Sequence, residues 1–228
     1  MVPEHTEGKH GLANDGTDDA AFARWLKAED NPVGIDILDC HTFAMAMMST
    51  TSDERIAKRF SQLRHWFGSE MAGSSPERAR SIRCFLNFPL NSPLSEGPLF
   101  KAEVMEDKWD IYLFAERLYF CRSWTGELIS CASVTFSDES MVVTGIETNS
   151  SEEDGIVIRQ VAFLIWSHVL HRLVLHPLPK RWGTDPEALT AHSFSVFGRW
   201  GWYGTMEDTL KLSPEQQAAV ESLPSRAE

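Results

Sequence analysis

Cysteine and histidine are the residues of this chain that could hold a metal ion. No two of the four cysteines form a C-x-x-C pair, the spacing typical of zinc and thioredoxin-like sites. His168 and His171 are three residues apart on a predicted helix, but the H-E-x-x-H pattern is absent and the sequence places no third ligand beside them. We therefore predict no metal site, no cofactor and free thiols that pack as small apolar side chains.

Two short strings combine residue types that nucleophilic enzymes use. They are Asp39-Cys40-His41 and His192-Ser193. Neighbouring side chains on a strand point to opposite faces, so adjacency in sequence does not predict a catalytic dyad. The G-x-S-x-G, Walker and Rossmann glycine patterns are absent as well. The sequence nominates no catalytic acid, base or nucleophile, and whether the chain is an enzyme stays open.

The string Arg122-Ser123-Trp124-Thr125-Gly126 is the most distinctive motif of the chain. It lies between two strand-like runs, and Gly126 can adopt the positive φ that a tight turn requires. In one interpretation Trp124 packs over this turn and Arg122 pairs with an acidic residue. In the other, Arg122 and Trp124 belong to a loop that contacts a ligand or a protein partner.

The same string resembles a strand-turn-strand element of an uncharacterised bacterial family. Members of that family carry RSWTG followed by two strands and a helix, sometimes beside ADP-ribose-processing modules. The resemblance covers residues 108–175, under a third of the chain, and only the five-residue string is specific. It implies a bacterial protein and assigns no catalytic residue.

A second candidate site is the aromatic and glycine-rich segment 194–204. Trp200, Trp202 and Tyr203 alternate there with glycines, so they could form a stacking platform or a partner-binding patch. Core packing is the alternative interpretation of the same side chains. We expect Arg199 to be the member of this segment that reaches solvent.

Charge and hydropathy narrow the classes of partner. The 228 residues carry a formal net charge of −12, which repels phosphate backbones and anionic lipid surfaces. The N-terminal residues lack the apolar core of a signal peptide, and polar residues interrupt the longest apolar run, Ile156–Leu175. We predict a cytoplasmic protein that binds neither nucleic acid nor membranes, with an oligomeric state that the sequence leaves open.

The elements that must position these residues follow from hydrophobic periodicity. The segment 109–146 contains alternating runs joined by short connections, which only antiparallel neighbours permit. We predict a meander of roughly three to five strands. The long helix Ile156–Leu175, about five turns, should be buried across this sheet.

Further helices are predicted on both sides of the meander. Thr51 and Glu54 suggest a capping box that starts an amphipathic helix. Pro186 and Pro214 follow residues that cap helices well. The predicted organisation is a flexible tail over residues 1–18 and a single α+β domain over residues 19–228.

Two functions fit these observations. The first is a noncatalytic binding or protein-interaction module, similar in its acidity to immunity proteins, with a basic protein as partner. The second is an enzyme or binder for a nucleotide or ADP-ribose-like ligand, in which arginines pair with phosphates and indoles stack on the base. The site residues for either function are Arg122, Trp124, Arg199, Trp200, Trp202 and Tyr203.

Overall fold

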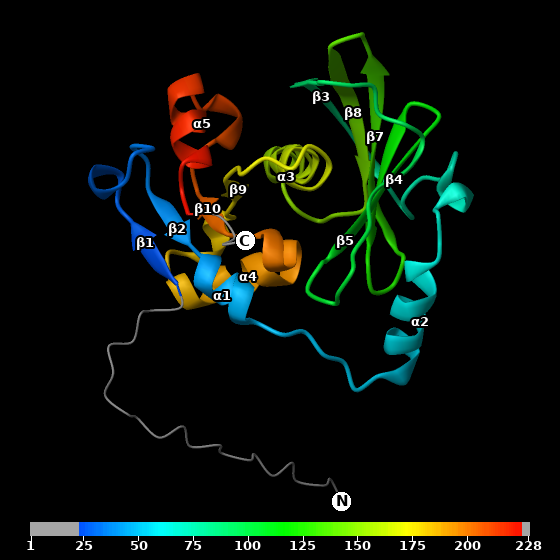
Figure 1. Cartoon of the computed structure of the whole chain (residues 1–228), viewed down its shortest axis with the longest axis horizontal. Coiled ribbons are helices and arrows are strands. Elements are labelled where there is room, and N and C mark those ends of the chain that lie inside the picture. The colour runs from blue at the N-terminus through cyan, green and yellow to red at the C-terminus, as the bar shows by residue number, and fades with distance from the viewer. Residues whose placement is uncertain (1–22, 225–228) are drawn as a thin grey trace, which may run out of the picture.

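The computed structural model describes residues 23–224, and the predicted tail over residues 1–18 lies outside them. The described strands form a six-stranded and a four-stranded sheet, with helix α3 between the two (Figure 1). The six-stranded sheet is antiparallel throughout and has the spatial order β3 (Arg80–Pro89), β8 (Ser140–Thr148), β7 (Leu128–Phe136), β6 (Arg117–Arg122), β5 (Trp109–Phe114) and β4 (Gly97–Phe100). The four-stranded sheet has the order β1 (Arg24–Leu26), β2 (Ile37–Asp39), β10 (Tyr203–Thr205) and β9 (His176–Pro177).

Within residues 23–224, five α-helices connect and cover these sheets. They are α1 (His41–Ala46), α2 (Glu54–Arg64), α3 (Asp154–Leu164), α4 (Pro186–Phe197) and α5 (Pro214–Glu221). Short 3-10 turns occur at η1 (Ala28–Asp30), η2 (Ser69–Met71), η4 (Lys180–Trp182), η5 (Gly198–Trp200) and η6 (Thr209–Lys211), and a π-helical turn η3 (Ile165–Val169) continues α3. Within the described part of the chain, no helix is both long enough and apolar enough to cross a bilayer.

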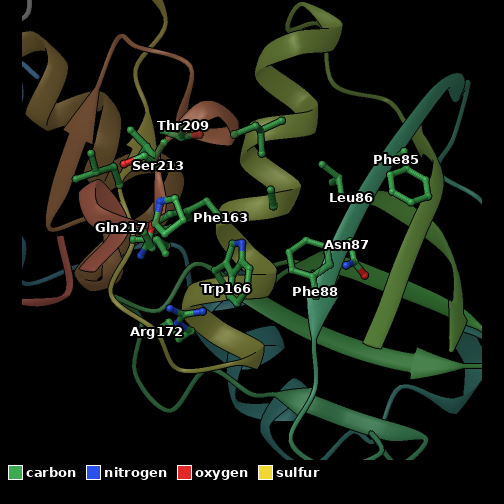
Figure 2. A pocket seen from close by; sticks show the side chains of 16 residues that line it. Phe85, Leu86, Asn87, Phe88, Phe163, Trp166, Arg172, Thr209, Ser213 and Gln217 are labelled. Carbon is green, nitrogen blue, oxygen red and sulfur yellow. The ribbon is translucent and has the colours of Figure 1, made fainter. Parts of the chain in front are cut away.

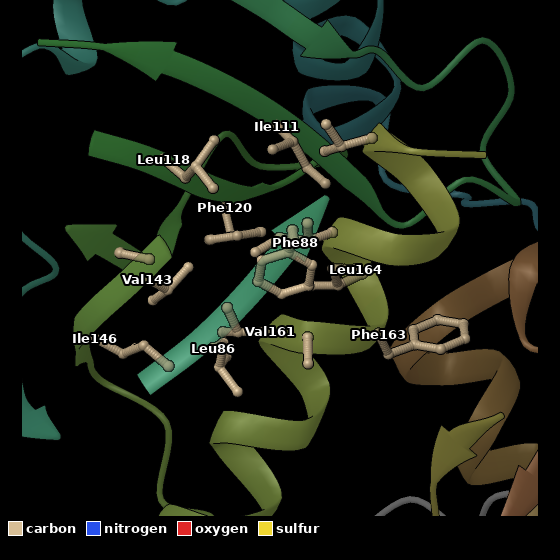
Figure 3. Packing of buried hydrophobic residues seen from close by; sticks show 14 of the residues in the cluster. Leu86, Phe88, Ile111, Leu118, Phe120, Val143, Ile146, Val161, Phe163 and Leu164 are labelled. Atoms are coloured by element: carbon tan, nitrogen blue, oxygen red, sulfur yellow. The ribbon is translucent and has the colours of Figure 1, made fainter. Parts of the chain in front are cut away.

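The main core lies between the six-stranded sheet and α3. Alternate residues of β5 and β6, such as Ile111, Leu118 and Phe120, are fully buried on the face that meets α3. Figure 3 shows these side chains converging on Val161 and Leu164 of the helix. Burial of each large apolar side chain contributes about 1.5–3 kcal/mol, so this face holds the helix firmly against the sheet.

The opposite face of the same sheet is covered by α2 and η2. Tyr112 and Tyr119 are fully buried there, with Trp66 and Met71 packed against them. Gly68 lies over the Tyr112 ring with a φ of 78°, and a Cβ at this position would come within 2.4 Å of the ring. Only glycine permits so close an approach in this left-handed conformation.

The expected fold class, a three- to five-strand meander under one long buried helix, is wrong in the number of strands, the number of sheets and the length of the helix. The predicted runs in 109–146 do form β5 to β8, but β3 and β4 extend the sheet to six strands. β3 pairs with β8 across fifty intervening residues, and local patterning carries no signal for such a distant pairing. The four-stranded sheet was not expected at all, because its strands are two or three residues long.

The expected helix over Ile156–Leu175 is also shorter than the apolar run. The α-helix ends at Leu164, the π-helical turn follows, and His171 adopts a left-handed φ of 53°. Leu175 then packs against the four-stranded sheet and α5 instead of the six-stranded sheet. The run is apolar because it serves two cores, not because it forms one helix.

Candidate functional site

The RSWTG string forms the tight turn between β6 and β7. The backbone N–H of Gly126 donates to the carbonyl of Arg122, and Gly126 has a φ of 75°. The Arg122 guanidinium does not pair with an acid. It donates to the carbonyls of Ser195 and Val196 at the end of α4, at 2.8 and 3.2 Å, where unsatisfied carbonyls attract cations.

Trp124 and Lys108 lie next to each other at this turn, and the Lys108 ammonium also lies 4.9 Å from the ring centroid of Phe194 on α4. The Trp124 indole donates to the carbonyl of Met105 at 2.7 Å, and the Lys108 ammonium lies 4.6 Å from the Trp124 ring centroid. Burial lowers the pKa of Lys108 to about 8, and the nearby positive charge of Arg122 adds to this effect. Lys108 thereby connects the turn after β6 to α4.

Arg199 is bound to a buried carboxylate, although its side chain remains 21% exposed. Asp107 is fully buried and accepts from Arg199 Nε at 2.6 Å and from Trp200 Nε1 at 3.0 Å. The guanidinium is therefore occupied by an internal ion pair. Gly198, at a φ of 62°, allows this approach, since a Cβ there would come within 1.7 Å of the Glu106 carbonyl oxygen.

Three of the predicted site residues come from the end of the aromatic segment. The structure brings Trp200 and Trp202 together and places Tyr203 elsewhere. Trp200 and Trp202 lie near-parallel, with ring centroids 6.5 Å apart and an interplanar angle of 5°. Both line a pocket of about 390 Å³, together with His171 and Glu221. We call this the tryptophan pocket. Tyr203 is buried in the core, where its hydroxyl donates to the Pro224 carbonyl.

A further feature that the sequence did not predict is a groove of about 390 Å³ between β3 and α5. Figure 2 shows β3 as one wall, Phe163 and Trp166 of the α3 and η3 segment as the floor, and Ser213 and Gln217 on the opposite wall. It shares three lining residues, Phe163, Arg172 and Val174, with the tryptophan pocket, so the two form one continuous surface. We call the pocket between β3 and α5 the groove.

The wall of the groove at β3 is an edge of the six-stranded sheet. The Leu90 N–H donates to the Glu139 carbonyl, which makes Leu90 and Glu139 a hydrogen-bonded pair. Pairs of an antiparallel ladder alternate, so the N–H and C=O of Asn87 point away from β8 toward the free side. Pro89 also faces that side, where its missing N–H costs the ladder nothing.

Side chains along β3 alternate between a buried and an exposed face over the length of the strand. Leu86 and Phe88 turn toward α3, whereas Phe85 and Asn87 turn to the other side (Figure 2). The register shifts between Arg83 and Leu86, and Phe85 in this bulge is 77% exposed. The apolar pair Phe85-Leu86 inside an otherwise alternating run is the sequence signal that could have revealed the site.

The side chains of Cys40, Cys121, His168 and His176 are buried and line neither the groove nor the tryptophan pocket. Burial raises the pKa of the Cys40 thiol to about 11 and that of Cys121 to about 12. It lowers the pKa of His168 and of His176 to about 3, so both imidazoles are neutral. Among residues 23–224, no group of three or more His, Cys, Asp or Glu residues is placed to hold a metal ion.

The hydrogen bonds of Ser167 define the tautomer of His168. The Ser167 hydroxyl donates to the Phe163 carbonyl at 2.7 Å and lies 2.7 Å from His168 Nδ1. Its one proton is used by the carbonyl, so Nδ1 carries the ring proton and Nε2 is left without a partner in the described part of the chain. The imidazole acts as a buried aromatic side chain, 5.1 Å from the Trp200 ring.

Searches of known protein families, of curated proteins and of solved structures return no match to this chain.

Proposed function

We propose that this chain is a noncatalytic protein-binding module that accepts an extended, basic segment of a partner protein along β3. The observation that carries the proposal is the unpaired edge of β3 beside an apolar groove. A peptide added to a sheet edge gains affinity from main-chain hydrogen bonds and specificity from side chains that enter neighbouring pockets. The groove offers both kinds of contact.

The available edge is short. The bulge between Arg83 and Leu86 interrupts it on one side, and Pro89 ends it on the other. Proteins protect sheet edges in this way against uncontrolled pairing, which leaves a stretch around Asn87 for a specific partner. The exposed Phe85 ring lies next to this stretch and can be covered by the incoming segment.

Charge favours a basic segment. The chain carries a formal net charge of −12. The wall of the groove opposite β3 belongs to residues 207–221, which contain four acidic residues and one basic residue. That basic residue, Lys211, forms an ion pair with Asp208. Opposite charges on the partner would steer the encounter and select against acidic segments.

The alternative function, binding of a nucleotide or an ADP-ribose-like ligand, has less support. It requires guanidinium groups that are free to pair with phosphates. Arg122 donates to two carbonyls and Arg199 to Asp107, so both candidates are already engaged. Arg122 also lines neither the groove nor the tryptophan pocket.

The proposal can be tested by selecting twelve-residue peptides displayed on phage against the full chain, with Asn87→Pro as the counter-target. This substitution removes the N–H that faces the free side and spares the β3–β8 ladder. We expect basic peptides with alternating apolar residues, and an affinity about tenfold lower for Asn87→Pro, because a lost hydrogen bond of ~1.4 kcal/mol corresponds to that factor. The matched control, Asn87→Thr, retains the N–H and should bind like the parent chain.

Three results would overturn the proposal. The selection could yield no peptide, or the selected peptides could bind Asn87→Pro and the parent chain equally well. Sedimentation of the parent chain alone could also reveal a dimer that Asn87→Pro dissociates, in which case β3 pairs with a second copy of this acidic chain. Circular dichroism of both variants ensures that any loss of binding is measured on folded protein.

A further inference from the structure

The tryptophan pocket combines two aromatic faces with one carboxylate. Trp200 and Trp202 contribute the near-parallel rings, and Glu221 of α5 contributes the carboxylate. Each indole uses its Nε1–H internally: that of Trp200 bonds to Asp107, and that of Trp202 to the Arg199 carbonyl. The indoles therefore offer their faces, but no free donors, to a ligand.

Glu221 has one oxygen in use and one free. Its Oε1 accepts from Arg172 Nε at 2.7 Å and from Gln217 Nε2 at 3.4 Å, whereas no residue between 23 and 224 donates to Oε2. A carboxylate has acceptor capacity for several donors on both oxygens. The pocket thus presents an unused hydrogen-bond acceptor beside aromatic surface. A ligand that fits it has hydrogen-bond donors and a planar group that can stack on an indole ring.

We infer that the tryptophan pocket accepts an arginine side chain of the bound segment, an inference that rests on the proposed function above. A guanidinium is planar, stacks on indole and donates in a fixed fork that suits a carboxylate. The chain uses this combination itself. The Arg172 guanidinium lies 4.7 Å from the Trp166 ring centroid while it donates to Glu221.

The positive charge of Arg172 does not exclude a second guanidinium. Arg172 is neutralised by Glu221 and stacks on Trp166, a ring that lines the groove and not the tryptophan pocket. The net negative charge of the chain adds an attractive field for the incoming cation. Since Arg172 lines both surfaces, a segment lying along the groove can direct one side chain past Arg172 into the pocket.

The experiment is a titration of the full chain with arginine amide, followed through the indole N–H resonances of its tryptophans. We expect saturable shifts at Trp200 and Trp202. Citrulline amide, which keeps the shape and loses the charge, and lysine amide, which keeps the charge and loses the plane, should each bind at least about tenfold more weakly. Glu221→Gln should lower the affinity for arginine amide about tenfold. Trp202→Phe should also lower this affinity, because phenylalanine offers a smaller aromatic face.

The control Glu187→Gln removes an exposed carboxylate on α4, outside the groove and the pocket, and should leave the titration unchanged. The inference fails if arginine amide shifts other tryptophans only, or if citrulline amide binds as well as arginine amide. It also fails if Glu221→Gln and Trp202→Phe, both folded, bind arginine amide like the parent chain. If phage-selected peptides still depend on the N–H of residue 87 in that case, the inference is wrong and the proposed function survives.

Discussion

Removal of the Arg199 guanidinium should be the most destabilising single change in the contact between the six-stranded sheet and the aromatic segment. Asp107 is fully buried and accepts from Arg199 Nε at 2.6 Å and Nη2 at 3.1 Å. Its other donors are neutral: the Trp200 indole at 3.0 Å and the backbone N–H groups of Glu103 and Val104 at 2.9 and 3.4 Å. Arg199→Met would keep these donors and leave the charge uncompensated.

The expected loss is about 3 kcal/mol in the free energy of unfolding. Breaking a buried ion pair by removing one partner costs about 3–5 kcal/mol, and the three neutral donors that remain place this site at the lower end. Asp107→Asn should lower the free energy of unfolding by less, because the Arg199 side chain is 21% exposed and can reach water. The double variant should resemble Asp107→Asn alone, since the two single changes remove the same interaction.

The assay is urea unfolding followed by circular dichroism, with stability taken from the midpoint and slope. Arg55→Met is the matched control, because Arg55 is 91% exposed and its ion pair with Asp53 lies on the surface of α2. This control should unfold like the parent chain. A loss of less than about 1 kcal/mol for Arg199→Met would show that the buried carboxylate does not depend on its cation, contrary to the electrostatic reasoning.

Two further predictions follow from burial and backbone conformation. Burial lowers the pKa of His168 and His176 to about 3, so both stay neutral in the folded chain at any pH well above 3. In the unfolded chain they take up protons near pH 6.5, so the free energy of unfolding should fall as the pH decreases from about 6 to 4. The slope, about 2.7 kcal/mol per pH unit for both together, can be measured by urea unfolding at several pH values, and ring-proton NMR signals that titrate near pH 6.5 would contradict it. Gly198→Ala should lower the free energy of unfolding by more than about 2 kcal/mol, because its Cβ would collide with the Glu106 carbonyl. Gly155→Ala, which points into open space on α3, should leave this free energy unchanged or raise it by about 0.5 kcal/mol. Equal melting temperatures for the two glycine variants would refute this comparison.

Local patterning was sufficient for elements that local interactions determine. The alternation from Trp109 onward predicted β5 to β8, because neighbouring strands with short turns pair in only one way. The helix starts at Pro186 and Pro214 were correct, and Ser213 forms a capping box with Gln216. The helix predicted from Thr51 is present, but its cap is Asp53, since the Thr51 hydroxyl accepts from the Asp53 N–H instead.

Long-range pairing explains what the sequence could not reveal. The spacing of Trp25 and Leu26 from the preceding apolar residues is compatible with a helix, yet Arg24–Leu26 forms β1, which exists through its pairing with β2. In the same way, Arg122 and Arg199 were recognised as distinctive, but their internal acceptors, the end of α4 and Asp107, lie more than seventy residues away in sequence. Trp200 and Trp202 line the pocket with Glu221, a neighbour that no spacing rule identifies.

The four-stranded sheet joins the two ends of the described chain. β2 pairs with β1 on one side and with β10 on the other, although Leu38 and Gly204 are separated by most of the sequence. During synthesis the N-terminal strands leave the ribosome long before their C-terminal partner exists. The six-stranded sheet has no such delay, because its strands all lie between residues 80 and 148. The order of translation thus favours maturation in two stages, with the central sheet assembled first and the termini closed together last.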